Sequence, residues 1–344
     1  MSSGNFRLFE KIADALIADL KEGLLPNMGS GEHATYNAAD ASLWFIWALT
    51  EYHRHNVSPE MRVWDRYGPV VKSILSRYRE GTHNGIRMDS DGLLEAVSPG
   101  MALTWMDAVC NGTPVTPRMG KAVELNALWY HAVCFALDLA AESEDMQFVR
   151  EWKALPELCA RSFVSVFWDE GKQYLADCVT DGVADWSVRP NQIFAVSLKY
   201  SPLPETIQRL VADKVAEELL TPRGLRTLSA GDPHYHGRYS GNQLQRDQAY
   251  HQGTIWPWLL GHFTDAYLRV YGGDALPLLQ EIYEGMAVVL EEYGLYSVAE
   301  LYDGDYPYRP GGTIAQAWSV AELIRMGQTI VNYRAQFKAA LINA

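Results

Sequence analysis

The feature that most constrains the fold is a helical segment that recurs at nearly constant spacing. Apolar residues cover most of the helical surface of five segments, and a helix that is apolar on all sides is normally buried. Four of these segments contain an amide side chain followed within a few residues by an aromatic one. The amides are spaced 65, 61 and 64 residues apart, which indicates an internal repeat. The five segments are 38–52, 122–141, 191–199, 254–271 and 314–325, and the pairs are Asn126 with Trp129, Asn191 with Phe194, Gln252 with Trp256, and Gln316 with Trp318.

Amphipathic helices are predicted between the buried ones, so that each repeat pairs one inner helix with one outer helix. Helical solenoids usually repeat roughly every 33 to 47 residues, so a period of about 63 favours hairpins that close into a ring. We therefore predict an all-α chain folded as a closed toroid of α/α hairpins. The first amphipathic helix carries Phe9, Ile12, Leu16 and Leu20 on one face, and similar patterns cover 59–79, 146–166, 204–219 and 274–292.

The number of predicted helices falls short of a complete ring. The sequence accounts for five inner and five outer helices and a tail helix at 330–341, whereas six hairpins need about twelve helices. The register places the first inner helix before Phe6. We expect the ring either to lack this helix, as in a truncated form, or to take it from a second chain or subunit. A single domain is predicted over 1–344, with an irregular insert at 82–119 and short strands near 84–96 and 172–187.

Composition narrows the classes of function. The net charge of −13 argues against binding to nucleic acid or to an anionic membrane, both of which require basic surfaces. The 11 Trp and 19 Tyr residues have flat faces and polar edges that suit sugar rings, although a large helical core also uses Trp for packing. The four cysteines form no CxxC pair, and no metal-binding pattern or signal peptide is visible. We expect a soluble cytoplasmic protein with no metal or cofactor.

In a ring of helical hairpins, the loops that lead into the inner helices gather at one end, called the rim here. One such loop contains Thr104-Trp105-Met106-Asp107, in which a carboxylate has large apolar neighbours. Apolar surroundings favour the protonated form of a carboxyl group, which a general acid requires. Asp107 is therefore a candidate general acid. The alternative is that Asp107 caps a helix or a turn.

A second carboxylate, Glu300, precedes an Asp-Gly turn and lies near the start of the last inner helix. Two carboxylates on different loops of one rim form the minimal apparatus of a glycosidase, because one protonates the leaving oxygen while the other activates water or attacks carbon. Asp303 and Asp305 follow in the same segment and are interpreted as turn residues. The segment lacks the spaced ligands of a calcium loop.

Other polar and aromatic residues at the rim are candidates for contacts with sugar hydroxyls and ring faces. Helix packing is the alternative for Trp44, Trp129 and Trp256, and a helix cap or hydroxyl contact is preferred over catalysis for His251. The candidate substrate-binding residues are Tyr36, Asp40, Trp44, Trp105, Glu124, Asn126, Trp129, Arg189, Asn191, Gln192, His251, Gln252, Trp256 and Gln316, with Tyr250 also at the rim.

These motifs together resemble the C-terminal amylo-α-1,6-glucosidase domain of glycogen debranching enzymes of the bacterial and archaeal type. The resemblance runs in order from about residue 6 to residue 326. The matching segments are 36–45 (YNAADASLWF), 103–108 (LTWMDA), 116–118 (TPR) with 120–121 (GK), 124–130 (ELNALWY), 189–192 (RPNQ), 225–229 (LRTLS), 250–258 (YHQGTIWPW), the segment around Glu300, and 315–319 (AQAWS).

The resemblance implies an (α/α)6 fold and the hydrolysis of α-1,6-linked glucose with inversion. The acid of the family's Thr-Trp-Met-Asp motif corresponds to Asp107, and its general base corresponds to Glu300. Inversion requires the two carboxyl groups to lie roughly 6.5–9.5 Å apart, with room for a water between them. An α-glucan or oligosaccharide is the implied substrate.

The sequence departs from the family at its N-terminus, where an earlier inner helix with a Trp-Gly-Arg-Asp-like segment and a β-rich domain are not found. This agrees with the helix count above. Two alternatives to a debranching glucosidase therefore remain open. One is an α-glycosidase of the same six-hairpin class with another oligosaccharide or glycoside as substrate, and the other is a truncated carbohydrate-binding protein with little activity.

Overall fold

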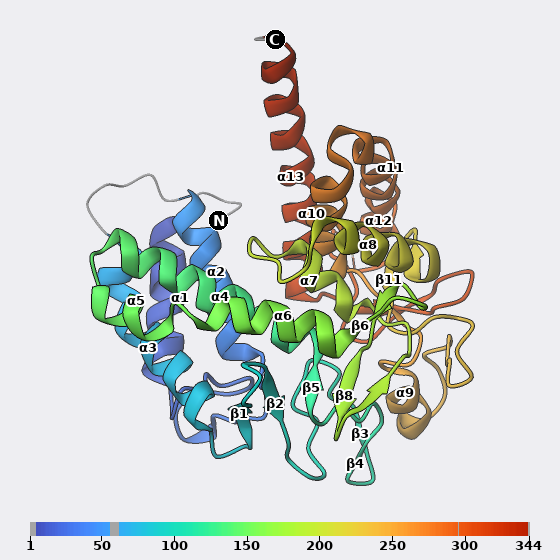
Figure 1. Cartoon of the computed structure of the whole chain (residues 1–344). Coiled ribbons are helices and arrows are strands. Elements are labelled where there is room, and N and C mark those ends of the chain that lie inside the picture. Colours follow the sequence, from blue (N-terminus) through green and yellow to red (C-terminus); the bar gives the residue numbers. More distant parts are fainter. Residues whose placement is uncertain (1–4, 56–61, 295, 343–344) are drawn as a thin grey trace. The chain divides into compact units, whose positions relative to one another are not determined.

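The computed structural model describes residues 5–55, 62–294 and 296–342 (Figure 1). Helices dominate these residues, which confirms the predicted all-α class. The chain forms two compact units, of which the first comprises 1–168, 178–185 and 199–203, and the second comprises 169–177, 186–198 and 204–344. The predictions of one domain and of a closed ring remain predictions.

In the first unit, α4 (Val123–Glu142) packs against four other helices (Figure 1). Its residues Leu125, Leu128, Trp129 and Val133 are fully buried, which agrees with the prediction that this segment is an inner helix. Its apolar surface thus supplies much of the driving force for folding of this unit. The surrounding helices are α2 (Ala41–His55), α3 (Val63–Glu80), α5 (Met146–Trp152) and α6 (Leu155–Phe167).

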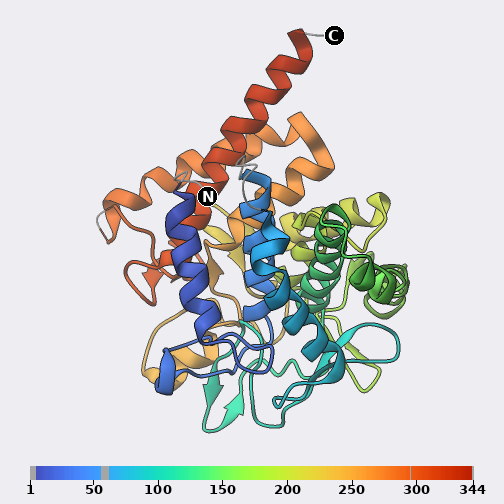
Figure 2. The same cartoon turned by 90° about the vertical axis from the view of Figure 1, so that its left-hand side faces the viewer.

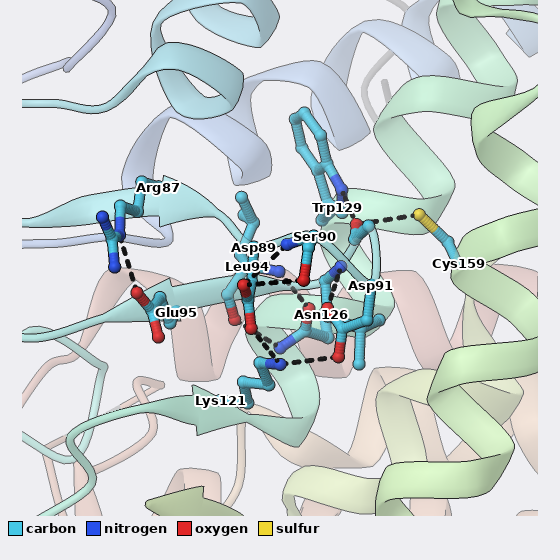
Figure 3. Close-up of polar contacts among 12 residues, drawn as sticks. Arg87, Asp89, Ser90, Asp91, Leu94, Glu95, Lys121, Asn126, Trp129 and Cys159 are labelled. Carbon is cyan, nitrogen blue, oxygen red and sulfur yellow. Dashed lines mark hydrogen bonds and ion pairs between the residues drawn. The ribbon is translucent and has the colours of Figure 1, made fainter. Parts of the chain in front are cut away.

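A short β-hairpin is held against α4 through polar contacts of buried groups (Figure 3). The strands β1 (Ile86–Met88) and β2 (Leu94–Ala96) pair antiparallel. The Asn126 amide accepts a hydrogen bond from the backbone N–H of Leu94 at 2.7 Å and donates one to the Leu94 carbonyl at 3.0 Å. The Trp129 indole N–H donates to the carbonyl of Gly92 at 3.0 Å. At the edge of this contact, Lys121 binds Asp89 and Asp91. The 82–119 insert therefore contains ordered strands.

The first unit also contains α1 (Phe6–Ala18), the 3₁₀ turn η1 (Gly31–His33) and further short strands. The predicted amphipathic helix is present as α1, but Ile12 and Leu16 of its apolar face are exposed. Phe6 and Phe9 instead contact the ring of Tyr52. The other strands are β3 (Val109–Cys110), β4 (Thr113–Pro114), β5 (Lys121–Ala122), β8 (Cys178–Thr180) and β9 (Val183–Asp185), of which β5, β8 and β9 form one sheet.

The second unit is built around α10 (Leu259–Tyr271), which packs against α7, α8 and α13. The helix α13 (Ala317–Ile342) is one continuous element, so the predicted tail helix is its second half. Figure 2 shows its last turns projecting beyond α10 and α11. The other helices of the second unit are η2 (Pro190–Ile193), α7 (Phe194–Ser197), α8 (Glu205–Leu219), α9 (Gln243–Ala249), η3 (Gly272–Ala275), α11 (Leu276–Ala287) and α12 (Val289–Glu292).

A five-stranded sheet in the second unit was not predicted. Its order is β10-β11-β12-β13-β14, and each strand pairs with the next one along the chain. The segment 254–271 therefore begins as a strand and not as a helix, because Pro257 disfavours helical geometry at the preceding residue. The strands are β10 (Leu220–Thr221), β11 (Gly224–Arg226), β12 (Ile255–Trp256), β13 (Leu301–Tyr302) and β14 (Pro310–Gly311).

Two other predicted inner helices differ from expectation. The segment 191–199 is a 3₁₀ turn followed by the short α7, and Pro202 and Pro204 follow it closely. The segment 314–325 is not buried on all sides, because Trp318 and Ile324 are exposed. The amide–aromatic repeat therefore lies at the start of a regular helix in α4 and α13, but not in the segments that begin with η2 and β12.

The contacts of Asn126 generate a test of the first unit. We expect Asn126→Ala to lower the free energy of unfolding by about 2–4 kcal/mol, because the N–H and C=O of Leu94 would lose a buried partner. Asn37→Ala is the matched control, since Asn37 is exposed, and it should change stability by less than about 0.5 kcal/mol. Urea unfolding followed by circular dichroism measures both. Equal effects of the two variants would contradict the structural role of Asn126.

Candidate active site

The segment that carries Asp107 is fixed at both of its ends. Before Asp107, the carbonyl of Leu103 accepts a hydrogen bond from the N–H of Ala39 at 2.7 Å. After it, the N–H of Val115 donates to the carbonyl of Ala108 at 2.9 Å, at the base of the β3–β4 hairpin. Thr104, Trp105 and Met106 are buried, whereas Asp107 is exposed. The apolar neighbours thus anchor the segment. They do not bury the Asp107 carboxylate, whereas the sequence had suggested apolar surroundings for it.

A buried ion pair supports this segment from below. The two terminal nitrogens of the Arg118 guanidinium group donate to the Glu124 carboxylate. Nη2 lies 2.5 Å from Oε2, and Nη1 binds Oε1. Nη1 also donates to the hydroxyl of Thr104 at 3.1 Å. The side chains of Arg118 and Glu124 are only 2% and 1% exposed. A bidentate pair of this kind has fixed geometry, so it holds Thr104, and with it the start of the Asp107 segment, in one position.

Asp40 lies at the start of α2 and is also buried. Its carboxyl pKa is raised to about 7, mainly by burial and also by the negative charges of Glu124 and Asp107, while hydrogen bonds from the backbone and from Trp44 partly oppose the rise. Three carboxyl groups of the first unit therefore interact: Asp40 directly before α2, Glu124 in α4 and Asp107 in the loop before β3. Asp40 can carry a proton near neutral pH.

The other predicted site residues of the first unit differ in their surroundings. Trp44 is half-buried, beside Trp47 in an edge-on contact at 5.5 Å. Tyr36 donates its hydroxyl to the carbonyl of Asp19 at 2.8 Å. Asn126 and Trp129 are fully buried and bind the β1–β2 hairpin, as described above. A role of these two residues in substrate binding remains a prediction, and the function proposed below does not use it.

Glu300 occupies a built hydrogen-bonding site in the second unit. Its Oε1 accepts hydrogen bonds from the Tyr250 hydroxyl at 2.8 Å and from the Gln316 amide at 3.1 Å. Its Oε2 accepts the backbone N–H of Thr313 at 2.9 Å. Three donors from separate segments therefore determine the orientation of both carboxylate oxygens.

The sheet explains how these donors converge. Glu300 directly precedes β13, and its own N–H donates to the carbonyl of Thr313 at 2.9 Å, just beyond β14. Gly312 lies between β14 and Thr313, and a Cβ at this position would come within 2.2 Å of the Glu300 Oε2. The Gly311-Gly312 pair in the sequence is thus a signal of close approach. The sequence did not single out Gly312 or Thr313, since a backbone donor has no side-chain signature.

The remaining predicted residues of the second unit mostly bind one another. Arg189 is buried and donates to the carbonyls of Thr227 and His251 and to the Gln252 amide oxygen, at 3.1, 2.8 and 2.8 Å. Asn191 donates to Asp177 at 2.7 Å, and the Gln192 oxygen accepts the N–H of Leu175 at 3.2 Å.

His251 and Trp256 form an aromatic support beneath Tyr250. The His251 and Trp256 rings stack at 5.2 Å, and Tyr250 contacts Trp256 edge-on at 5.1 Å. The Trp256 indole donates to the Tyr250 carbonyl at 3.1 Å. This packing fixes the Tyr250 hydroxyl that binds Glu300. Trp256 therefore packs against Tyr250, which agrees with the packing alternative, and a direct contact of Trp256 with a sugar remains a prediction.

Asp303 and Asp305 were interpreted as turn residues, but their side chains also bind a neighbouring loop. The Asp303 Oδ1 accepts the N–H of Tyr239 at 2.8 Å, and the Asp305 Oδ1 accepts the Tyr235 hydroxyl at 3.0 Å. Both carboxylates also face Arg238. They therefore hold the loop that follows β11 against the β13–β14 turn.

Metal chemistry has no evident donor set in the described part of the chain, which contains no group of three or more His, Cys, Asp or Glu side chains suited to hold an ion. Over the same residues, no helix combines the length and apolar character needed to cross a bilayer.

Comparison with known proteins places the chain in a family. The family model described as amylo-alpha-1,6-glucosidase matches residues 1–325. Glycogen debranching enzyme of Saccharomyces cerevisiae is 26% identical, in a match that covers 78% of this chain and 23% of the yeast protein. The chain therefore spans about a quarter of the length of this relative.

Among solved structures, a GH78 family rhamnosidase of Bacillus sp. GL1 has a similar fold. The similarity has a TM-score of 0.65 at 17% sequence identity and covers 95% of this chain and 30% of the rhamnosidase. The family match, in contrast, rests on the sequence and extends over nearly the whole chain. It confirms the resemblance found in the motifs, and the protein belongs to the amylo-alpha-1,6-glucosidase family of glycoside hydrolases.

Proposed function

We propose that this glycoside hydrolase removes α-1,6-linked glucose from an α-glucan with inversion of configuration, with Asp107 as general acid and Glu300 as general base. The observation that carries the proposal is the hydrogen-bonded site around Glu300, in a chain whose family match includes both residues. The name of the yeast relative, glycogen debranching enzyme, supports the choice of an α-glucan as substrate.

The surroundings of Glu300 suit a base that activates water. The two oxygens of a carboxylate offer about four acceptor positions. Tyr250, Thr313 and Gln316 fill three of them, which leaves about one position for a hydrogen bond from a water molecule. A carboxylate with fixed oxygens can take the proton of that water while the oxygen attacks the anomeric carbon.

The surroundings of Asp107 suit an acid that reaches an external substrate. Its carboxyl group is exposed, while the backbone on either side of it is tied to Ala39 and Val115. Such a group can donate its proton to the glycosidic oxygen as the bond to glucose breaks. Buried Asp40, with its raised pKa, adds a nearby carboxyl group that can donate a hydrogen bond to a sugar hydroxyl.

The roles of the two carboxylates can be separated with two substrates. Asp107→Asn should lower kcat/KM on an α-1,6-linked oligosaccharide by about 10²–10⁴-fold, because the departing O6 oxygen of the remaining saccharide needs protonation. The same variant should lose much less activity on α-glucosyl fluoride, since fluoride leaves without a strong acid. Glu300→Gln should lose activity on both substrates, because both reactions need activated water.

Initial rates of glucose and fluoride release measure these effects. Equal losses on both substrates for Asp107→Asn would contradict its role as acid. Purified chain that binds branched dextrin but releases no glucose would favour a carbohydrate-binding protein.

The stereochemical course is a second test. Inversion predicts that β-glucose is the first product from an α-1,6-linked substrate, because water attacks the face opposite the leaving group. Proton NMR of the anomeric region during the first minutes distinguishes this product from α-glucose. Parallel assays on a branched limit dextrin and on maltose test the linkage, and a preference for maltose would point to another α-glycosidase of the same class.

The raised pKa of Asp40 predicts a pH-dependent stability. A buried carboxyl with a pKa of about 7 binds its proton more tightly in the folded chain than in the unfolded chain, where 3.8 is the ordinary value. Its contribution to stability is therefore fully present below about pH 4 and is lost as the pH rises through 7. Asp40→Asn should remove this loss of stability. The free energy of unfolding of the variant should exceed that of the wild type by up to about 4 kcal/mol at pH 8 and differ little from it at pH 4. Urea unfolding at both pH values measures the effect, and a constant difference would contradict it.

A further inference from the structure

The segment after Glu300 presents an aromatic side chain to solvent. It forms a β-hairpin in which β13 pairs with β14, with Leu301 opposite Gly311 and Tyr302 opposite Pro310. Tyr306 lies in the connecting turn and is 80% exposed. Its ring contacts the half-buried Tyr308 edge-on, with the centroids 6.1 Å apart. The hairpin thus links Glu300, the proposed general base, to the exposed ring of Tyr306.

Arg238 ties this turn down from the loop that follows β11. Its Nη2 donates to the carbonyl of Tyr306 at 2.9 Å. Its Nη1 lies 3.5 Å from the Asp303 carboxylate, and its Nε lies 3.6 Å from that of Asp305. One guanidinium group therefore contacts the turn at three residues, including the residue with the exposed ring.

Further hydrogen bonds join the same two loops. The N–H of Gly304 donates to the carbonyl of Gly237 at 2.8 Å, and the Tyr235 hydroxyl donates to Asp305 at 3.0 Å. The N–H of Tyr239 donates to Asp303 at 2.8 Å. The turn is thus held at several points although Tyr306 at its tip is 80% exposed.

This combination of rigidity and exposure fits a ligand-binding surface. A ring that is 80% exposed gains little from the hydrophobic effect, so burial does not account for its position. A pre-ordered turn loses less conformational entropy when a ligand binds than a mobile loop does. A tyrosine ring offers an apolar face with a polar edge, which matches the C–H face and the hydroxyl rim of a sugar ring.

We propose that Tyr306 is a stacking platform for an α-glucan chain at a position outside the site of bond cleavage. The proposal rests on the proposed function for the identity of the sugar. A strand rises about 3.3 Å per residue, so Tyr306, six residues after Glu300, lies within about 20 Å of it. An extended glucan chain spans such a distance, whereas a single glucose does not. The platform therefore increases affinity for long chains over short ones.

Binding to glycogen tests the platform independently of catalysis. In the full chain carrying Glu300→Gln, Tyr306→Ala should weaken retardation in a glycogen-containing native gel, with a Kd about three- to tenfold higher. Tyr306→Trp should retain or improve binding. Tyr296→Ala is the matched control, because Tyr296 is 83% exposed in the same unit but does not belong to the hairpin, and it should leave the Kd unchanged.

The same variants in the active enzyme complete the test. Tyr306→Ala should raise KM for glycogen more than KM for a small α-1,6-linked oligosaccharide. Unchanged glycogen binding by Tyr306→Ala, an equal loss in Tyr296→Ala, or a changed oligomeric state on gel filtration in place of a changed Kd would each overturn the platform. If Tyr306→Ala weakens glycogen binding but the wild type releases no glucose, the platform stands and the proposed hydrolysis fails. If the wild type releases glucose and Tyr306→Ala binds normally, the reverse holds.

Discussion

The free-energy cost of burying an unpaired polar group determines what the polar residues of the sequence motifs do in this chain. A helical protein with many short strands leaves backbone N–H and C=O groups at each junction, and each needs a partner once water is excluded. Asn126 supplies both partners for Leu94, and Arg189 supplies partners for two carbonyls at once. Amides and an arginine that suggested sugar contacts in the sequence therefore satisfy the backbone in the structure.

The same chemistry positions the proposed catalytic groups. Glu300 receives the N–H of Thr313 only because β13 and β14 bring residues 300 and 313 together, and Gly312 allows the close approach. Near Asp107, Arg118 donates one hydrogen bond to Thr104 and also forms an ion pair with Glu124. Hydrogen bonds therefore fix the carboxylate of Glu300 directly, whereas on the acid side they fix the backbone segment that carries Asp107.

The sequence predicted what depends on periodicity and on motif, and it failed where pairing between distant segments decides the structure. The buried α4 and the amphipathic α3 and α8 follow from apolar spacing alone. The five-stranded sheet does not, because strands of two or three residues have no measurable period. Asp107 and Glu300 were found from their motifs, but the exposure of Asp107 could not be predicted, since the apolar neighbours that suggested burial turn away from it.

Asp40 and Glu124 show how similar burial can lead to different chemistry. Glu124 faces the Arg118 guanidinium, which compensates its charge in the protein interior. Asp40 instead faces two further carboxylates, Glu124 and Asp107, so that both burial and its neighbours oppose ionisation. A carboxyl group that keeps its proton near neutral pH can donate a hydrogen bond, which an ionised carboxylate cannot. Arg118 pairs with Glu124, while burial and two neighbouring carboxylates favour the protonated form of Asp40. The first unit therefore has a hydrogen-bond donor close to its proposed acid.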